Sequence, residues 1–141
     1  MNRRDTEEGN VLLLVPAAML VFLAMVALVI DAATMFLAER QLADLAAATA
    51  QDAVRALDVP EYYASGAIRV DRDAAARRMR DLRVDFERHA VVDDVACVLD
   101  TRPARAVASC RGRAHPILAQ IWGGSNGVEI AATESARAAL G

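Results

Sequence analysis

Four side chains in this sequence belong to types that bind metals or undergo redox chemistry: Cys97, Cys110, His89 and His115. Their spacing contains neither Cys-x-x-Cys nor His-x-x-x-His, the short pairs in which zinc ligands usually occur. The sequence also has no Ser/His/Asp order, no paired carboxylates in a pocket-forming context and no cofactor fingerprint. The residues therefore predict no catalytic, cofactor-binding or metal-binding site, and a protein that is not an enzyme.

The two cysteines instead suggest a structural role. Apolar stretches with strand character surround Cys97 and Cys110, and a polar segment with a proline separates them. If the stretches pair as a hairpin, the register that places Cys97 opposite Cys110 also places Leu99 opposite Ala108, with all four on one face. A cross-strand disulfide between Cys97 and Cys110 is then sterically reasonable. Two buried free thiols remain the alternative.

An uncharged apolar run from Val11 to Ile30 stands out in a chain of which 25% is charged. At ~1.5 Å per residue it spans ~30 Å, the thickness of the hydrocarbon core of a bilayer. The h-region of a signal peptide is shorter and ends in small residues, so the run predicts a transmembrane anchor. Arg3 and Arg4 precede it, which predicts a cytoplasmic N-terminus and an extracytoplasmic chain from Asp31 onward in the cell membrane.

Two residues of this membrane helix are unusual. Pro16 removes a backbone hydrogen bond, which membrane helices tolerate. Asp31 stands at the outer end, where a charge is costly unless it is solvated or paired. We favour an interface carboxylate that ends the span, and the alternative is a contact to a neighbouring helix or polar group in an assembly.

The remaining chain predicts a small head. No Gly or Pro occurs between Asp31 and Leu57, so the helix is expected to continue beyond the membrane with an apolar stripe at spacings of three and four. Asp71 is a good N-cap for a second, amphipathic helix. Three strand-like stretches follow, at Val95–Leu99, Ala106–Cys110 and Val128–Thr133. The stripe of the first helix comprises Met35, Ala38, Leu42, Leu45, Thr49, Ala53 and Leu57.

These elements predict an α+β, pilin-like fold: a long N-terminal transmembrane helix extends into a small extracytoplasmic head with one further helix and a short antiparallel sheet. The expected segments are a cytoplasmic segment (1–10), the transmembrane helix (11–30), its extracytoplasmic extension (31–58) and the head domain (59–141). Residues 61–141 carry twelve Arg and eleven acidic residues. This balance predicts no nucleic-acid binding.

Four segments follow one another in the N-terminal part of the sequence: Glu8-Gly9, Val11 to Pro16, Val29-Ile30-Asp31 and Phe36 to Ala48. In this order they resemble the TadE/TadG-like proteins of the Tad (Flp-type) pilus assembly system. In that family a Gly precedes an apolar helix with an early Pro, an Asp follows the helix in the TadG-like branch, and an alanine-rich continuation comes next.

The resemblance implies a membrane-anchored, pilin-like accessory component of pilus assembly or secretion, which acts through helix packing and docking of its head. Its implied partners are the lipid bilayer, other pilus-assembly membrane proteins or minor pilins, and further copies through helix contacts. TadE-type proteins resemble prepilins, which are cleaved after a Gly that has a Glu five residues beyond it. Here Leu14 holds that position, so cleavage between Gly9 and Asn10 is disfavoured and the TadG-like branch is preferred.

Two other classes of function compete with this interpretation. A membrane-anchored extracytoplasmic ligand-binding or sensor module would need a pocket with converging polar groups, and the head has few aromatic residues to line one. A membrane-bound enzyme would need the catalytic residues that the sequence lacks.

Overall fold

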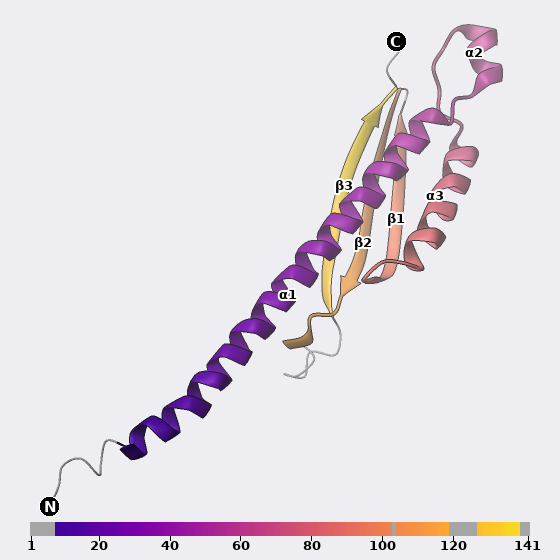
Figure 1. Cartoon of the computed structure of the whole chain (residues 1–141). Coiled ribbons are helices and arrows are strands. Elements are labelled where there is room, and N and C mark those ends of the chain that lie inside the picture. Colours follow the sequence, from indigo (N-terminus) through magenta and orange to yellow (C-terminus); the bar gives the residue numbers. More distant parts are fainter. Residues whose placement is uncertain (1–7, 103, 119–126, 139–141) are drawn as a thin grey trace, which may run out of the picture.

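The computed structural model describes residues 8–102, 104–118 and 127–138. The fold is α+β, with one long apolar N-terminal helix, two further helices and a three-stranded antiparallel sheet (Figure 1). The helices are α1 (Glu8–Arg55), α2 (Val59–Ser65) and α3 (Arg72–Glu87), and the strands are β1 (Val92–Arg102), β2 (Arg105–Ala114) and β3 (Val128–Arg137). The N-terminal half of α1 extends away from the rest, and its C-terminal half packs on the sheet.

Helix α1 runs without interruption through Pro16 and forms the spine of the molecule. The predicted stripe faces the core: Ala38, Leu42, Leu45, Thr49 and Ala53 are buried, although Leu57 is exposed. Alanines dominate the buried face of α1, and they allow the helix axis to approach the sheet closely because their side chains are short. The buried alanines of α1 therefore form the surface that packs on the sheet.

The two further helices occupy the segment between α1 and the sheet, where one helix was predicted. Asp71 caps α3 as expected, since its carboxylate accepts hydrogen bonds from the backbone N–H groups of Asp73 (2.9 Å) and Ala74 (3.0 Å). No helix was expected between Leu57 and Asp71, where the structure has the short α2. Pro60 lies in the first turn of α2, where proline is favoured, and Asp58 caps that turn.

The sheet has the order β1-β2-β3. The predicted hairpin register is confirmed, with Cys97 opposite Cys110 and Leu99 opposite Ala108. The strands are longer than predicted, because the polar residues assigned to a turn pair up to Arg102 opposite Arg105. Near its start β1 carries a bulge between Asp93 and Ala96.

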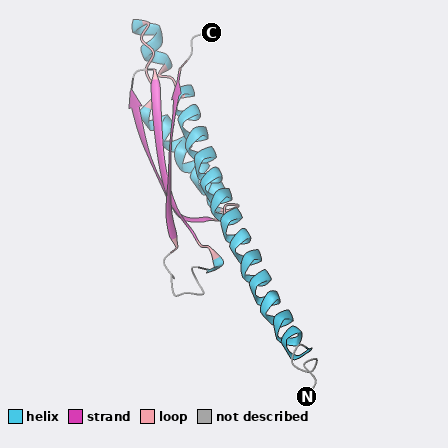
Figure 2. Cartoon of the chain, turned by 90° about the vertical axis from the view of Figure 1, so that its left-hand side faces the viewer, coloured by secondary structure: helices cyan, strands magenta, loops and turns pink. Residues whose placement is uncertain are grey.

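The sheet is covered on one face only. Helices α1 and α3 both lie on that face (Figure 2), where α1 packs on β2 and β3 and α3 packs on β1. The opposite face, here called the uncovered face, displays Ala96 to Arg102 of β1 at even positions and Arg105 to Arg113 of β2 and Glu129 to Arg137 of β3 at odd positions. No element of the described chain packs on it.

Candidate functional site at the base of the head

Asp31 binds the head at the point where α1 enters it. One carboxylate oxygen, Oδ1, accepts the backbone N–H of Ile117 at 2.8 Å, and Oδ2 accepts that of Leu118 at 2.7 Å. Asp31 is only 8% exposed. Charge-assisted hydrogen bonds to a carboxylate are among the stronger polar contacts in proteins. Asp31 therefore joins α1 to a segment 86 residues away in the sequence.

The connection from β2 presents these two N–H groups. After Ala114 the chain passes through His115 and the buried Pro116, and a helical turn begins at Ile117. The first N–H groups of a helical turn have no partner within the helix, so the Asp31 carboxylate caps that turn from another segment. His115 Nε2 lies 3.5 Å from Asp93 Oδ2, which ties the connection to the start of β1.

Gly127 keeps the return to β3 close to the same place. Its φ is +66°, and a Cβ there would lie 2.9 Å from the carbonyl oxygen of Ala114 and 2.8 Å from the His115 ring. Both the positive φ and the crowding favour glycine at this position. The base of the head is thus a compact junction, which we call the Asp31 junction: Asp31, His115, Pro116, Ile117, Leu118 and Gly127.

The Asp31 junction connects α1 to the segment after β2 through two hydrogen bonds. Both carboxylate oxygens are engaged by backbone donors, so the group does not serve as a free base or nucleophile. The sequence favoured an interface carboxylate, with a contact in an assembly as the alternative. Neither interpretation included the contact within the chain that the structure shows, from Asp31 to the backbone of Ile117 and Leu118. Sequence reasoning missed Ile117 and Leu118, and the only local signal was Pro116, which often precedes or begins a helical turn.

The Asp31 junction also marks a boundary in exposure along α1. Among Leu14–Ile30 the large apolar side chains expose between 39% (Val26) and 69% (Leu20) of their surface. Beyond Asp31, Ala38 and Leu42 are completely buried. By length and composition, the helix that contains this stretch, Leu14–Arg55, could cross a membrane. Gly9 and Asn10, between which prepilin cleavage was considered and disfavoured, lie in the first turn of α1.

The cysteines form a disulfide in the middle of the hairpin. Cys97 and Cys110 are joined with their Cα atoms 4.1 Å apart. Their sulfurs are therefore not available as metal ligands. His89 lies at the end of α3, and its Nδ1 is 3.2 Å from the carbonyl oxygen of Asp85. Among residues 8–102, 104–118 and 127–138, no group of three His, Cys, Asp or Glu side chains is placed to hold a metal ion.

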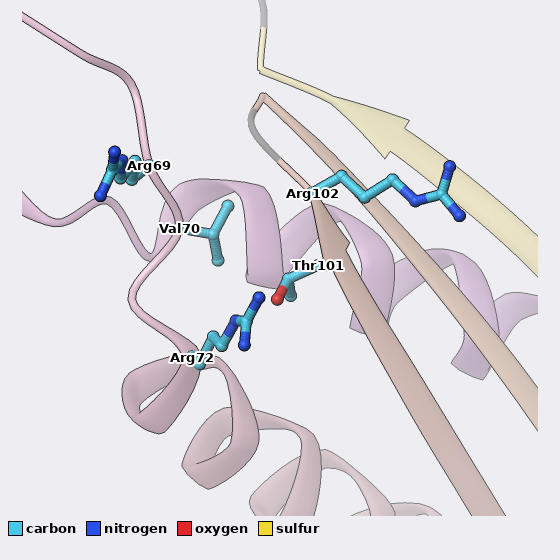
Figure 3. Close-up of a pocket in the computed structure, with 5 residues that line it drawn as sticks. All are labelled: Arg69, Val70, Arg72, Thr101 and Arg102. Carbon is cyan, nitrogen blue, oxygen red and sulfur yellow. The ribbon is translucent and has the colours of Figure 1, made fainter.

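A hollow of about 330 Å³ near the start of α3 is lined by Arg69, Val70, Arg72, Thr101 and Arg102. Three arginines suggest an anion site, but their side chains do not converge. In Figure 3 Arg72 points toward Thr101, whereas Arg69 and Arg102 point away to opposite sides. Arg69 lies 3.9 Å from Glu61 and Arg102 3.4 Å from Asp100, so each already faces a carboxylate. The three arginines therefore do not form an anion-binding site in this hollow.

A second hollow, of about 360 Å³, follows the seam between α1 and α3. Its lining is mixed, with the apolar side chains of Leu45, Ala48, Leu82, Phe86 and Ala90 and the polar side chains of Gln41, Asp44, Asp85 and His89. This seam is part of the helix–helix packing.

No known protein family, curated protein or solved structure matches this chain.

Proposed function

We propose that this protein is a membrane-anchored, pilin-like accessory component of a Tad-type pilus assembly or secretion machine. In this proposal α1 anchors the chain through Leu14–Ile30, the N-terminus is cytoplasmic and the head stands outside the cell membrane. The observation that carries the proposal is the division of α1 at Asp31 into an exposed apolar half and a half buried in the head. A helix of this kind gives lateral contacts in the bilayer and a rigid link to a docking head.

The Asp31 junction supports this role mechanically. A load on the head passes to the membrane helix through α1 itself and through the two hydrogen bonds that the N–H groups of Ile117 and Leu118 donate to the Asp31 carboxylate. The junction lies at the level where the apolar stretch ends, so it would sit at the membrane surface. The head then has a fixed height and orientation relative to its neighbours, which an assembly component requires.

The hollows favour assembly over ligand sensing. A sensor needs polar groups that converge on one ligand, whereas the arginines of the hollow near α3 diverge. The hollow along the seam between α1 and α3 has a mixed apolar and polar lining. The divergence of the arginines supports docking through surfaces in this proposal.

Deletion of the gene and complementation with single variants test the proposal. We expect surface piliation and adhesion to be lost on deletion and restored by the unaltered chain. An Asp31→Ala variant should restore them less well, and the exposed-acid control Glu39→Ala should restore them fully. Unchanged pili and adhesion in the deletion strain would contradict the proposal.

A further inference from the structure

Three arginines form a row across the uncovered face at one end of the sheet. Arg102 lies directly opposite Arg105 on the neighbouring strand, and Arg105 lies directly opposite Arg137. Adjacent strands are about 4.8 Å apart, so the row is about 10 Å wide. All three residues are exposed. We call these residues the arginine row.

The fold itself does not explain the arginine row. Like charges directly opposite each other on neighbouring strands destabilise a sheet. Asp100, 3.4 Å from Arg102, is the one carboxylate that faces the row among the described residues. Among residues 8–102, 104–118 and 127–138, Arg105 forms a hydrogen bond to a hydroxyl, Ser135 Oγ at 3.4 Å, and neither Arg105 nor Arg137 forms an ion pair. Within that part of the chain, no carboxylate neutralises these two positive charges.

Two apolar side chains lie on the same face as the row. Val107 is at the position next to the row, opposite Asp100 and Ser135. Val98, two same-face positions beyond Arg102 on β1, is 70% exposed. Arginine is enriched in protein–protein interfaces relative to the rest of the protein surface. Carboxylates bind arginine in a two-pronged geometry that fixes both position and orientation.

We propose that the far end of the uncovered face binds an acidic segment of a protein partner, with carboxylates on Arg105 and Arg137 and an apolar side chain on Val98 and Val107. This interaction surface is separate from the membrane helix and from the Asp31 junction. Binding of an acidic segment at this surface does not depend on the proposed role in pilus assembly.

Two other anionic partners fit less well. A polyanion is attracted by a broad positive field, but residues 61–141 carry twelve Arg against eleven acidic residues. Lipid headgroups of the anchoring membrane lie too far away, a point that rests on the proposed anchor. Ala106, next to the row, packs with Ala53 and Ala56 near the end of α1, and α1 is about 36 Å long from Asp31 to Arg55.

Nuclear magnetic resonance on the full chain in nanodiscs of neutral lipid tests the proposal. The probe is a synthetic peptide of four Glu-Val repeats, and the matched control peptide has Gln in place of Glu. We expect the Glu peptide to shift the amide signals around Val98, Arg105 and Arg137, with an effect that weakens as salt increases. The Gln peptide should leave these signals in place.

Charge-matched variants then locate the site. Arg105→Gln combined with Arg137→Gln should weaken binding of the Glu peptide at least tenfold. Arg77→Gln combined with Arg80→Gln removes two exposed charges from α3 and should leave the affinity unchanged. Neither double variant should lower the melting temperature, because all four side chains are exposed. Arg105→Gln with Arg137→Gln should, if anything, raise it, because it removes two like charges that lie directly opposite each other.

Three results would overturn the proposal. The first is no shift on the uncovered face at millimolar Glu peptide. The second is equal loss of affinity in the two double variants, which would indicate nonspecific attraction. The third is tighter binding of heparin, or of nanodiscs with anionic lipid, to the arginine row, which would assign the surface to a polymer or a membrane.

Discussion

Removal of the Asp31 carboxylate should loosen the base of the head. In Asp31→Ala the N–H groups of Ile117 and Leu118 lose bonds of 2.8 and 2.7 Å to a charged oxygen. Each hydrogen bond to a charged group contributes about 1.5–3 kcal/mol, which sets an upper bound of about 6 kcal/mol for the pair. Water can replace part of this, because Ile117 is exposed. We therefore expect a loss of about 2–3 kcal/mol, or a roughly 30- to 150-fold shift toward the open junction.

Hydrogen exchange at single amides measures this shift directly. In the detergent-solubilised chain the amides of Ile117 and Leu118 should exchange at least tenfold faster in Asp31→Ala. Asp31→Asn should give an intermediate effect, because one amide oxygen can still accept while its NH₂ group opposes the second N–H. Glu39→Ala, an exposed acid on the same helix, is the control and should change nothing. Unaltered exchange at both amides in Asp31→Ala would refute the assigned role of Asp31.

Three further predictions concern the stability of the head. Reduction of the Cys97–Cys110 disulfide, which closes a sequence separation of 13, should lower the free energy of unfolding by about 3 kcal/mol in the chain-entropy model; the melting temperature with and without reductant measures it, and equal values would count against it. Thr49 is 2% exposed and its hydroxyl has no hydrogen-bond partner among the described residues. Thr49→Val should therefore raise the free energy of unfolding, measured by denaturant titration, by about 1 kcal/mol. A loss of stability would show that the hydroxyl has a partner. A Cβ on Gly112 would collide with Val92, so Gly112→Ala should destabilise by about 1–3 kcal/mol and the addition of Val92→Ala should restore part of that loss; no gain in the double variant would point to another cause.

Local patterns in the sequence were enough for much of the fold. The stripe from Ala38 to Ala53 and the cap at Asp71 follow from helix geometry, which acts over three or four residues. The hairpin register follows from the alternation around Cys97 and Cys110. These features need no knowledge of distant contacts, and the structure contains all of them.

The features that sequence reasoning missed depend on context. Proline both ends and begins helices, so Pro60 was compatible with a stop or with the start of α2, and only the Asp58 cap distinguishes them. The strand ends at Asp100 and Arg102 were assigned to a turn because exposed polar residues resemble a loop. The contact from Asp31 to Ile117 joins segments 86 residues apart. No local pattern encodes such a pair, so the candidate site could be found only in the folded chain.

Two engineered cysteines test the proposal that α1 crosses the membrane and presents the head outside the cell. Ser135 is exposed on the uncovered face, and Asn2 lies on the opposite side of the apolar stretch in the sequence. A membrane-impermeant maleimide should label Ser135→Cys in intact cells and should label Asn2→Cys only after the cells are permeabilised. Labelling of Asn2→Cys but not Ser135→Cys in intact cells would show the opposite topology, with the head in the cytoplasm. Release of the chain from membranes by carbonate extraction would contradict the membrane anchor.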